Sequence, residues 1–215
     1  MSPFSFFKKN KVKLPERDID DLKKITKILF IDDRAFGNVD IIKNDGWKNT
    51  MRIKDADSLD QTEIREAHIL FVDIQGVGKR LKFKDQGLGL IQAIKQKYPN
   101  KKVIVYSSED QGKIEAFHPG IDAADSRLPK NADPYQYQVL IEKYSAEAFD
   151  LSECIDRIQK LMINEFGHSV TRDEVTKNLE NIYKSQTFDV ASIGKAFSIS
   201  NAGSIADIVS LFFAP

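Results

Sequence analysis

The sequence is poor in cysteine and contains no long apolar run. Its one cysteine, Cys154, excludes a disulfide within this chain of 215 residues and is typical of a reducing compartment. No apolar run approaches the roughly 18 residues that a membrane-spanning helix needs. The N-terminal segment MSPFSFFKKNKVKLP has its aromatic residues before its lysines, the reverse of a secretory signal. We therefore expect a cytoplasmic protein without stable membrane insertion.

An excess of charge of either sign is also missing. The 32 Lys and Arg residues balance the 32 Asp and Glu residues, which argues against a broadly basic nucleic-acid binder but leaves room for a local patch. His68, His118 and His168 are far apart and lack the spacing of metal ligands. The G-x-G-x-x-G pattern of dinucleotide-binding loops is absent as well. Overall charge, histidine spacing and glycine patterns therefore do not indicate a function, and only short local motifs remain as evidence for one.

Three short, almost wholly apolar runs are typical of strands buried on both faces of a parallel sheet. They are ITKILFID (25–32), HILFVDI (68–74) and KKVIVYSS (101–108), and weaker strand patterns follow at TMRIKDA (50–56) and at 121–130. Helical patterns alternate with them, including a short one at 111–120 that Pro119 and Gly120 would end, and one opened by Asp133 and Pro134. This alternation predicts right-handed crossovers and an open, doubly wound α/β domain with five parallel strands.

The pattern divides the chain into three parts: an N-terminal extension (1–24), the α/β domain (25–148) and a small all-α unit (149–215). Ile155, Ile158 and Met162 share one stripe of a predicted helix in the last part. A Thr-x-x-Glu box at Thr171 predicts the start of another helix. We expect three or four helices in this unit.

Polar residues stand where the predicted strands end. Asp32 and Asp33 follow the first buried strand, Asp73 ends the second, Ser107 follows the third and Lys130 follows the last. In an open parallel sheet, ligands bind beyond the carboxyl ends of the strands. Three acids in one place repel unless a cation neutralises them, and Mg²⁺ or Mn²⁺ with oxygen ligands is a natural solution. One acid could instead attack a phosphoryl group whose charge the metal and the lysine offset.

The strand ends Asp-Asp, Asp and Ser, followed by LPK before the last helix, resemble the receiver domain of two-component response regulators, a flavodoxin-like fold. The resemblance implies that Asp73 accepts a phosphoryl group from a sensor histidine kinase or a phosphotransfer protein of a phosphorelay. It also implies a Mg²⁺ ion held by Asp73, by Asp33 directly, by Asp32 through water and by the backbone carbonyl of Gln75. Ser107 would bind a phosphoryl oxygen, and Lys130 would pair with the phosphoryl group. Such a protein is not an enzyme beyond modifying and unmodifying its own aspartate.

The sequence departs from the receiver pattern in three places. Val77 replaces a usual proline, and the loop 76–86 is about six residues longer than usual and carries Lys79, Arg80, Lys82 and Lys84. Asn131 replaces the proline after the lysine, which puts the usual cis peptide in doubt because a non-proline cis bond costs roughly 2.5–4 kcal/mol. Arg127 occupies the aromatic switch position.

The alternative is therefore a pseudo-receiver, an interaction module that works without phosphate. The basic loop is read as a solvated face in preference to a phosphate or nucleic-acid patch.

The helical unit is not basic. Residues 146–215 contain ten acidic and six basic residues, and no helix is rich in Arg, Lys, Gln or Asn, which argues against DNA binding. Dimerisation or partner docking is the preferred output, with a homodimer through this unit as one form of it. The apolar ending with Ile208, Val209, Leu211, Phe212 and Phe213 must be covered either by the domain itself or by another chain.

Overall fold

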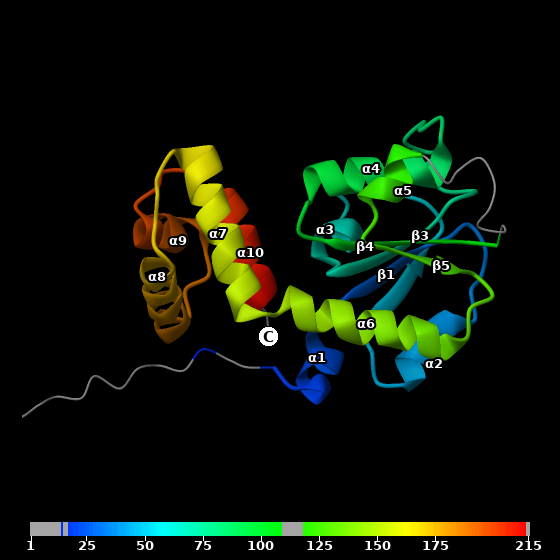
Figure 1. Cartoon of the computed structure of the whole chain (residues 1–215), viewed down its shortest axis with the longest axis horizontal. Helices are drawn as coiled ribbons and strands as arrows, with labels where there is room; N and C mark the ends of the chain where they lie inside the picture. The colour runs from blue at the N-terminus through cyan, green and yellow to red at the C-terminus, as the bar shows by residue number, and fades with distance from the viewer. Residues whose placement is uncertain (1–13, 15–16, 109–117, 214–215) are drawn as a thin grey trace, which may run out of the picture. The chain divides into compact units, whose positions relative to one another are not determined.

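The chain forms two compact units, Arg17–Asp150 and Leu151–Phe213 (Figure 1). The structure, a computed structural model, describes residues 14, 17–108 and 118–213. The first helix, α1 (Ile19–Ile25), belongs to the first unit and contacts α6. The boundary that the sequence places between residues 24 and 25 therefore falls inside a helix of the α/β unit, and residues 17–24 are part of that unit.

The α/β unit contains the predicted five-stranded parallel sheet. Its strands are β1 (Ile28–Ile31), β2 (Thr50–Ile53), β3 (Ile69–Asp73), β4 (Lys102–Ser107) and β5 (Ser126–Pro129). Their order is β2-β1-β3-β4-β5, and every neighbouring pair is parallel. The three apolar runs form the central strands, and the two weaker patterns form the edges. The predicted fold class is confirmed.

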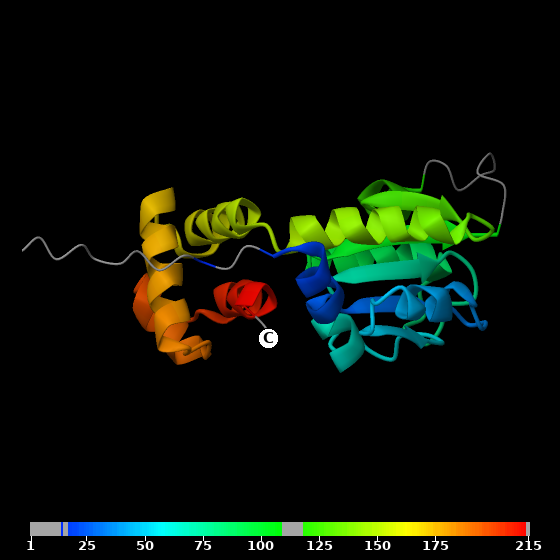
Figure 2. The same ribbon diagram turned by 90° about the horizontal axis from the view of Figure 1, so that it is seen from below.

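Helices cover both faces of the sheet, as Figures 1 and 2 show. One face packs against α1, α2 (Asn38–Asn44) and α6 (Pro134–Ala148), and the other against α3 (Thr62–Glu66), α4 (Gln86–Lys97) and α5 (Pro119–Ala123). Successive strand residues point to opposite faces. In β1, Ile28 and Phe30 therefore enter the first core, whereas Leu29 and Ile31 enter the second. Two covered faces explain why the central strands are continuously apolar.

The expectation around Pro119 was wrong in its direction. Residues 111–117 of the predicted helix lie outside the described residues, and Pro119 begins α5 instead of ending a helix. The backbone N–H of Gly120 donates to Nδ1 of His118 over 2.9 Å, which caps the new helix. Proline is favoured at the first helical position because its missing N–H would have no partner there. Pro134 follows the same rule and opens α6 after its cap Asp133, as the sequence predicts.

The helical unit consists of α7 (Leu151–Phe166), α8 (Arg172–Ser185), α9 (Val190–Phe197) and α10 (Gly203–Phe213). Thr171 and Glu174 form the predicted capping box at the start of α8. Ile208, Val209, Phe212 and Phe213 lie buried in the core that the four helices share. The apolar ending is therefore covered by the helical unit itself, one of the two alternatives that the sequence left open. No helix in the described residues has both the length and the apolar character to cross a membrane.

Candidate functional site

The strand register brings the predicted carboxylates together. Ile31 of β1 pairs with Val72 of β3, so the next residues, Asp32 and Asp73, stand side by side on neighbouring strands, about 4.8 Å apart in a sheet. One carboxylate oxygen from each of Asp32, Asp33 and Asp73 lies within 4.8 Å of the other two. Asp32 and Asp73 are buried and Asp33 is exposed. The strand order reverses between β1 and β3, where open α/β sheets bind their ligands.

Lys130 joins the two buried acids. Its Nζ lies 2.6 Å from Oδ2 of Asp73 and 3.0 Å from Oδ2 of Asp32. The backbone N–H of Lys130 donates to the carbonyl of Ser107 over 2.7 Å, which continues the pairing of β5 with β4. Burial is the strongest single influence on the Lys130 pKa and lowers it, but the hydrogen bonds to Asp73 and Asp32 and the charges of these two acids together outweigh burial and raise that pKa. The lysine therefore remains a cation at the site.

Tyr106 is a site residue that the sequence reasoning missed. Its hydroxyl donates to Oδ2 of Asp32 over 2.9 Å, and its ring lies 5.4 Å from Nζ of Lys130. Burial raises its pKa most, followed by the charge of Asp32, so the hydroxyl keeps its proton and stays a donor. Strand alternation was the available signal: Tyr106 pairs with Asp73 and enters the same core as Phe30 and Phe71.

Asp73 lies in an environment that favours a neutralising cation. Burial, the largest influence, raises its pKa above the ordinary value, and the charge of Asp32 adds to this. Hydrogen bonds from Lys130 and from the Gln75 backbone only partly compensate. Carboxylate oxygens at this spacing are suitable ligands for Mg²⁺.

The backbone beside the acids is shaped for a carboxylate. Gly76 has φ of +85°, and a Cβ atom there would lie 2.3 Å from Oδ2 of Asp33. Glycine at this position therefore leaves the space that the Asp33 carboxylate occupies. The acids and this space together fit a bound Mg²⁺ ion, which Asp33 and Asp73 would hold, with Asp32 behind them.

The two serines after β4 differ in position. Ser107 ends the strand and is buried, whereas the exposed Ser108 lines the cavity beside Asp73. The predicted contact between Ser107 and a phosphoryl oxygen stays a prediction. No peptide bond in the described residues is cis, and this includes the bond between Lys130 and Asn131.

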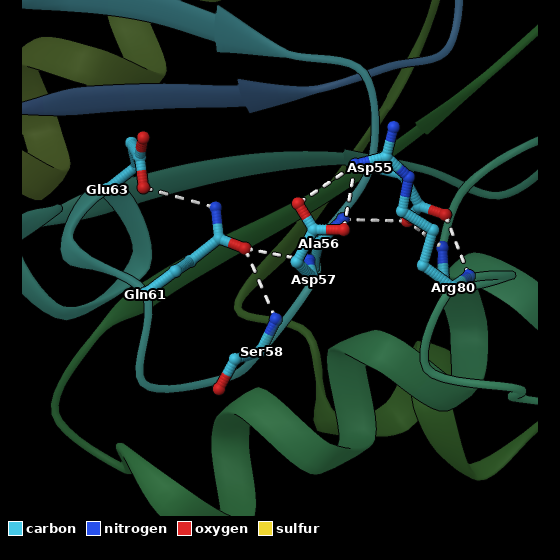
Figure 3. A network of polar contacts seen from close by, with 8 residues as sticks. Asp55, Ala56, Asp57, Ser58, Gln61, Glu63 and Arg80 are labelled. Atoms are coloured by element: carbon cyan, nitrogen blue, oxygen red, sulfur yellow. Dashed lines mark hydrogen bonds and ion pairs between the residues drawn. The ribbon is translucent and has the colours of Figure 1, made fainter.

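The long loop after β3 is attached to the loop after β2, as Figure 3 shows. The buried carboxylate of Asp55 accepts hydrogen bonds from the backbone N–H groups of Gly78 over 2.5 Å and of Arg80 over 3.1 Å. The guanidinium of Arg80 donates to both carboxylate oxygens of Asp57, over 2.8 and 2.9 Å. Val77 is fully buried in the core beneath. These contacts give the loop 76–86 a defined path beside the site.

A cavity of about 520 Å³ opens beside the acids. Its lining includes four predicted site residues, Asp33, Asp73, Gln75 and Lys130. It also includes Arg34 and two lysines of the long loop, Lys79 and Lys84. The loop singled out in the sequence as an oddity is therefore a wall of the site.

Comparison with known proteins gives matches among solved structures alone: no family model and no curated protein matches the chain. A response regulator from Thermotoga maritima is 19% identical with a TM-score of 0.42, covering 56% of this chain and 98% of that one. The receiver domain of NtrX from Brucella abortus is 27% identical with a TM-score of 0.41, covering 56% and 98%. A Burkholderia pseudomallei response regulator with a phosphorylated aspartic acid, calcium ion and citrate is 14% identical with a TM-score of 0.42, covering 88% and 99%.

The class of the α/β unit follows from its own geometry. A five-stranded parallel sheet in the order β2-β1-β3-β4-β5 has the flavodoxin-like fold, and here three carboxylates and a lysine lie at its carboxyl edge. Four further helices, α7 to α10, follow this fold in the chain.

Proposed function

We propose that the chain is a signalling protein whose α/β unit accepts a phosphoryl group on Asp73 in a Mg²⁺-dependent reaction. One observation carries the proposal: Nζ of Lys130 lies 2.6 Å from the buried Asp73 carboxylate, while oxygens of Asp32 and Asp33 lie within 4.8 Å of it. One lysine cannot neutralise three acids and an incoming phosphoryl group. The arrangement therefore supports a divalent cation as the missing charge.

In the proposed step, an oxygen of Asp73 attacks the phosphorus of a phosphohistidine on a sensor histidine kinase or a phosphotransfer protein. The P–N bond breaks, its electron pair stays with the imidazole nitrogen, and an acyl phosphate forms on Asp73. Bound Mg²⁺ would supply positive charge for the phosphoryl oxygens. Lys130, already hydrogen-bonded to Asp73, would pair with a phosphoryl oxygen, and the hydroxyl of Ser107 would donate a hydrogen bond to another.

We also propose that the output passes through the helical unit without DNA. The excess of acidic over basic residues across 146–215, ten against six, supports this. A homodimer through this unit or docking to another protein would then be the readout of the added charge on Asp73.

The test is the intact mass of the full chain after incubation with acetyl phosphate and Mg²⁺. We expect a gain of about 80 Da, the mass of one phosphoryl group, that EDTA and Asp73→Asn both abolish. Asp60→Asn is the matched control, because Asp60 pairs with Lys97 away from the site, and it should keep the gain.

A pseudo-receiver is the second candidate, and the anchored loop 76–86 beside the acids is the observation that favours it. In that case a folded, Mg²⁺-binding protein would show no mass gain with acetyl phosphate or with a candidate histidine kinase. That result would replace phosphorylation with a docking function.

A further inference from the structure

The cavity beside Asp73 is larger than a phosphoryl group requires. Its volume of about 520 Å³ falls within the range of about 300–1,000 Å³ typical of small-molecule sites. It extends from the acids to the long loop, where Lys79 and Lys84 line it. The space therefore has room for a ligand that continues beyond the phosphoryl position.

The charges that line this space are unevenly paired. Lys130 pairs with Asp73 and Asp32, and Nε2 of His118 lies 3.2 Å from Oδ2 of Asp85. By contrast, the side chains of Arg34, Lys79 and Lys84 make no ion pair within the described part of the chain. Once Lys130 and a bound metal ion engaged the acids, Arg34, Lys79 and Lys84 would leave the rest of the cavity lining positively charged.

The backbone that carries two of these cations, Lys79 and Arg34, is held in place. Lys79 lies between Gly78 and Arg80, whose N–H groups both donate to Asp55. The N–H of Arg34 donates to Asp32 over 2.9 Å, and its carbonyl accepts from the Arg52 guanidinium over 3.1 Å. Fixed backbone positions reduce the entropy that binding must otherwise remove.

We propose that Arg34, Lys79 and Lys84 form an anion subsite for the second negatively charged group of a small phosphorylated ligand. The phosphoryl end of that ligand would lie at Asp73, and its second anionic group would lie against the three cations. The phosphoryl half of this assignment rests on the proposed function, whereas the anion half rests on the cavity and its unpaired cations. The ligand class is a small molecule with a phosphoryl group and a second anionic group, such as a carboxylate.

The test compares two stable phosphonates by isothermal titration calorimetry on the full chain, with free Mg²⁺ held at one saturating concentration. Phosphonoacetate has a phosphonate and a carboxylate, whereas ethylphosphonate has similar size and no carboxylate. We expect phosphonoacetate to bind at least about tenfold more tightly, a difference of about 1.4 kcal/mol. Lys79→Gln and Lys84→Gln should each reduce that ratio several-fold.

Lys82→Gln is the matched control, because Lys82 belongs to the same loop but is not among the residues that line the cavity. It should leave the ratio unchanged. Equal affinities for the two phosphonates, no measurable binding of either, or an equal loss in Lys82→Gln would overturn the subsite and leave a solvated basic face. Because binding needs no phosphoryl transfer, a failed mass experiment with a retained phosphonoacetate preference would remove the proposed function and keep the subsite.

Discussion

Lys130 bridges Asp73 and Asp32, at 2.6 and 3.0 Å, so one ammonium serves two buried carboxylates from neighbouring strands. Its side chain reaches them from the residue after β5, across the Tyr106 ring of β4. Asp33, the exposed third acid, has no part in this bridge. The site therefore has more negative than positive charge. We expect the stability of the protein to change when a metal binds, when a charged side chain is replaced and when the pH changes.

Lys130→Met should destabilise the metal-free protein, because it leaves two adjacent carboxylates buried without a counter-charge. Removing one partner of a buried pair commonly costs about 3–5 kcal/mol, and we expect a loss of about 3 kcal/mol in urea unfolding with EDTA. Saturating Mg²⁺ should recover part of the loss. Lys97→Met removes an exposed ion pair with Asp60 and should cost less than about 1 kcal/mol. Equal losses in the two variants would show that the Lys130 bridge stabilises the protein no more than an exposed ion pair does.

Asp73→Asn should raise the free energy of unfolding of the metal-free protein at pH 7. Burial raises the pKa of Asp73 above its ordinary 3.8, so the folded protein tolerates the ionised carboxylate less well than the unfolded chain does. This penalty is absent below the unfolded pKa and complete above the folded pKa, so stability is lost as pH rises between them. The gain in the variant should shrink as pH falls toward 3.8.

Asp60→Asn is the contrasting variant for this pH series. The Lys97 hydrogen bond holds the pKa of Asp60 below its usual value. The stability that this group contributes is present at neutral pH and is lost as pH falls through its lowered pKa. Asp60→Asn should therefore lower stability at pH 7, opposite in sign to Asp73→Asn. The same sign in both variants would contradict the burial argument for Asp73.

Tyr106→Phe should loosen the Asp32 carboxylate without changing the aromatic packing. The substitution removes the hydroxyl that donates to Oδ2 of Asp32 over 2.9 Å, and a hydrogen bond to a charged group is worth about 1.5–3 kcal/mol. We expect a loss of this size in stability and a severalfold change in Mg²⁺ affinity measured by calorimetry. Tyr137→Phe is the control, since the Tyr137 hydroxyl donates to the Pro129 carbonyl over 3.2 Å and not to the acids. An unchanged Mg²⁺ affinity in Tyr106→Phe would limit Tyr106 to packing.

Asp55→Asn should release the long loop. The carboxylate of Asp55 accepts from the N–H groups of Gly78, Arg80 and Ala56, and the amide has one oxygen fewer to accept them. Amide hydrogen exchange should accelerate at residues 78 and 80, with a stability loss of about 1–3 kcal/mol for groups left unsatisfied. Asp57→Asn, which weakens only the exposed Arg80 ion pair, should leave these amides protected. Slow exchange in Asp55→Asn would place the loop's anchor elsewhere, for example at the buried Val77.

Short sequence patterns were sufficient to predict most of the strands and several helix starts. The central strands could be found because burial on both faces requires uninterrupted apolar residues, as in β1 and β3. Helix starts could be predicted where a residue suits the unpaired N–H groups of the first turn, as at Pro134 and in the capping box of Thr171. The prediction that Pro119 ends a helix was wrong because proline can either follow a helix or begin one. The cap from His118 shows that Pro119 begins α5.

The candidate site divides in the same way. Local sequence was enough to place Asp32, Asp33, Asp73 and Lys130 at strand ends, because the alternation of elements fixes which edge each strand end reaches. By contrast, three contacts are visible only in the folded chain: Lys130 bridges two acids, Tyr106 donates to Asp32, and Asp55 accepts from the loop that carries Lys79. Such contacts join residues 23–98 positions apart in the chain. They depend on register and side-chain reach across several strands, which no short stretch of sequence specifies.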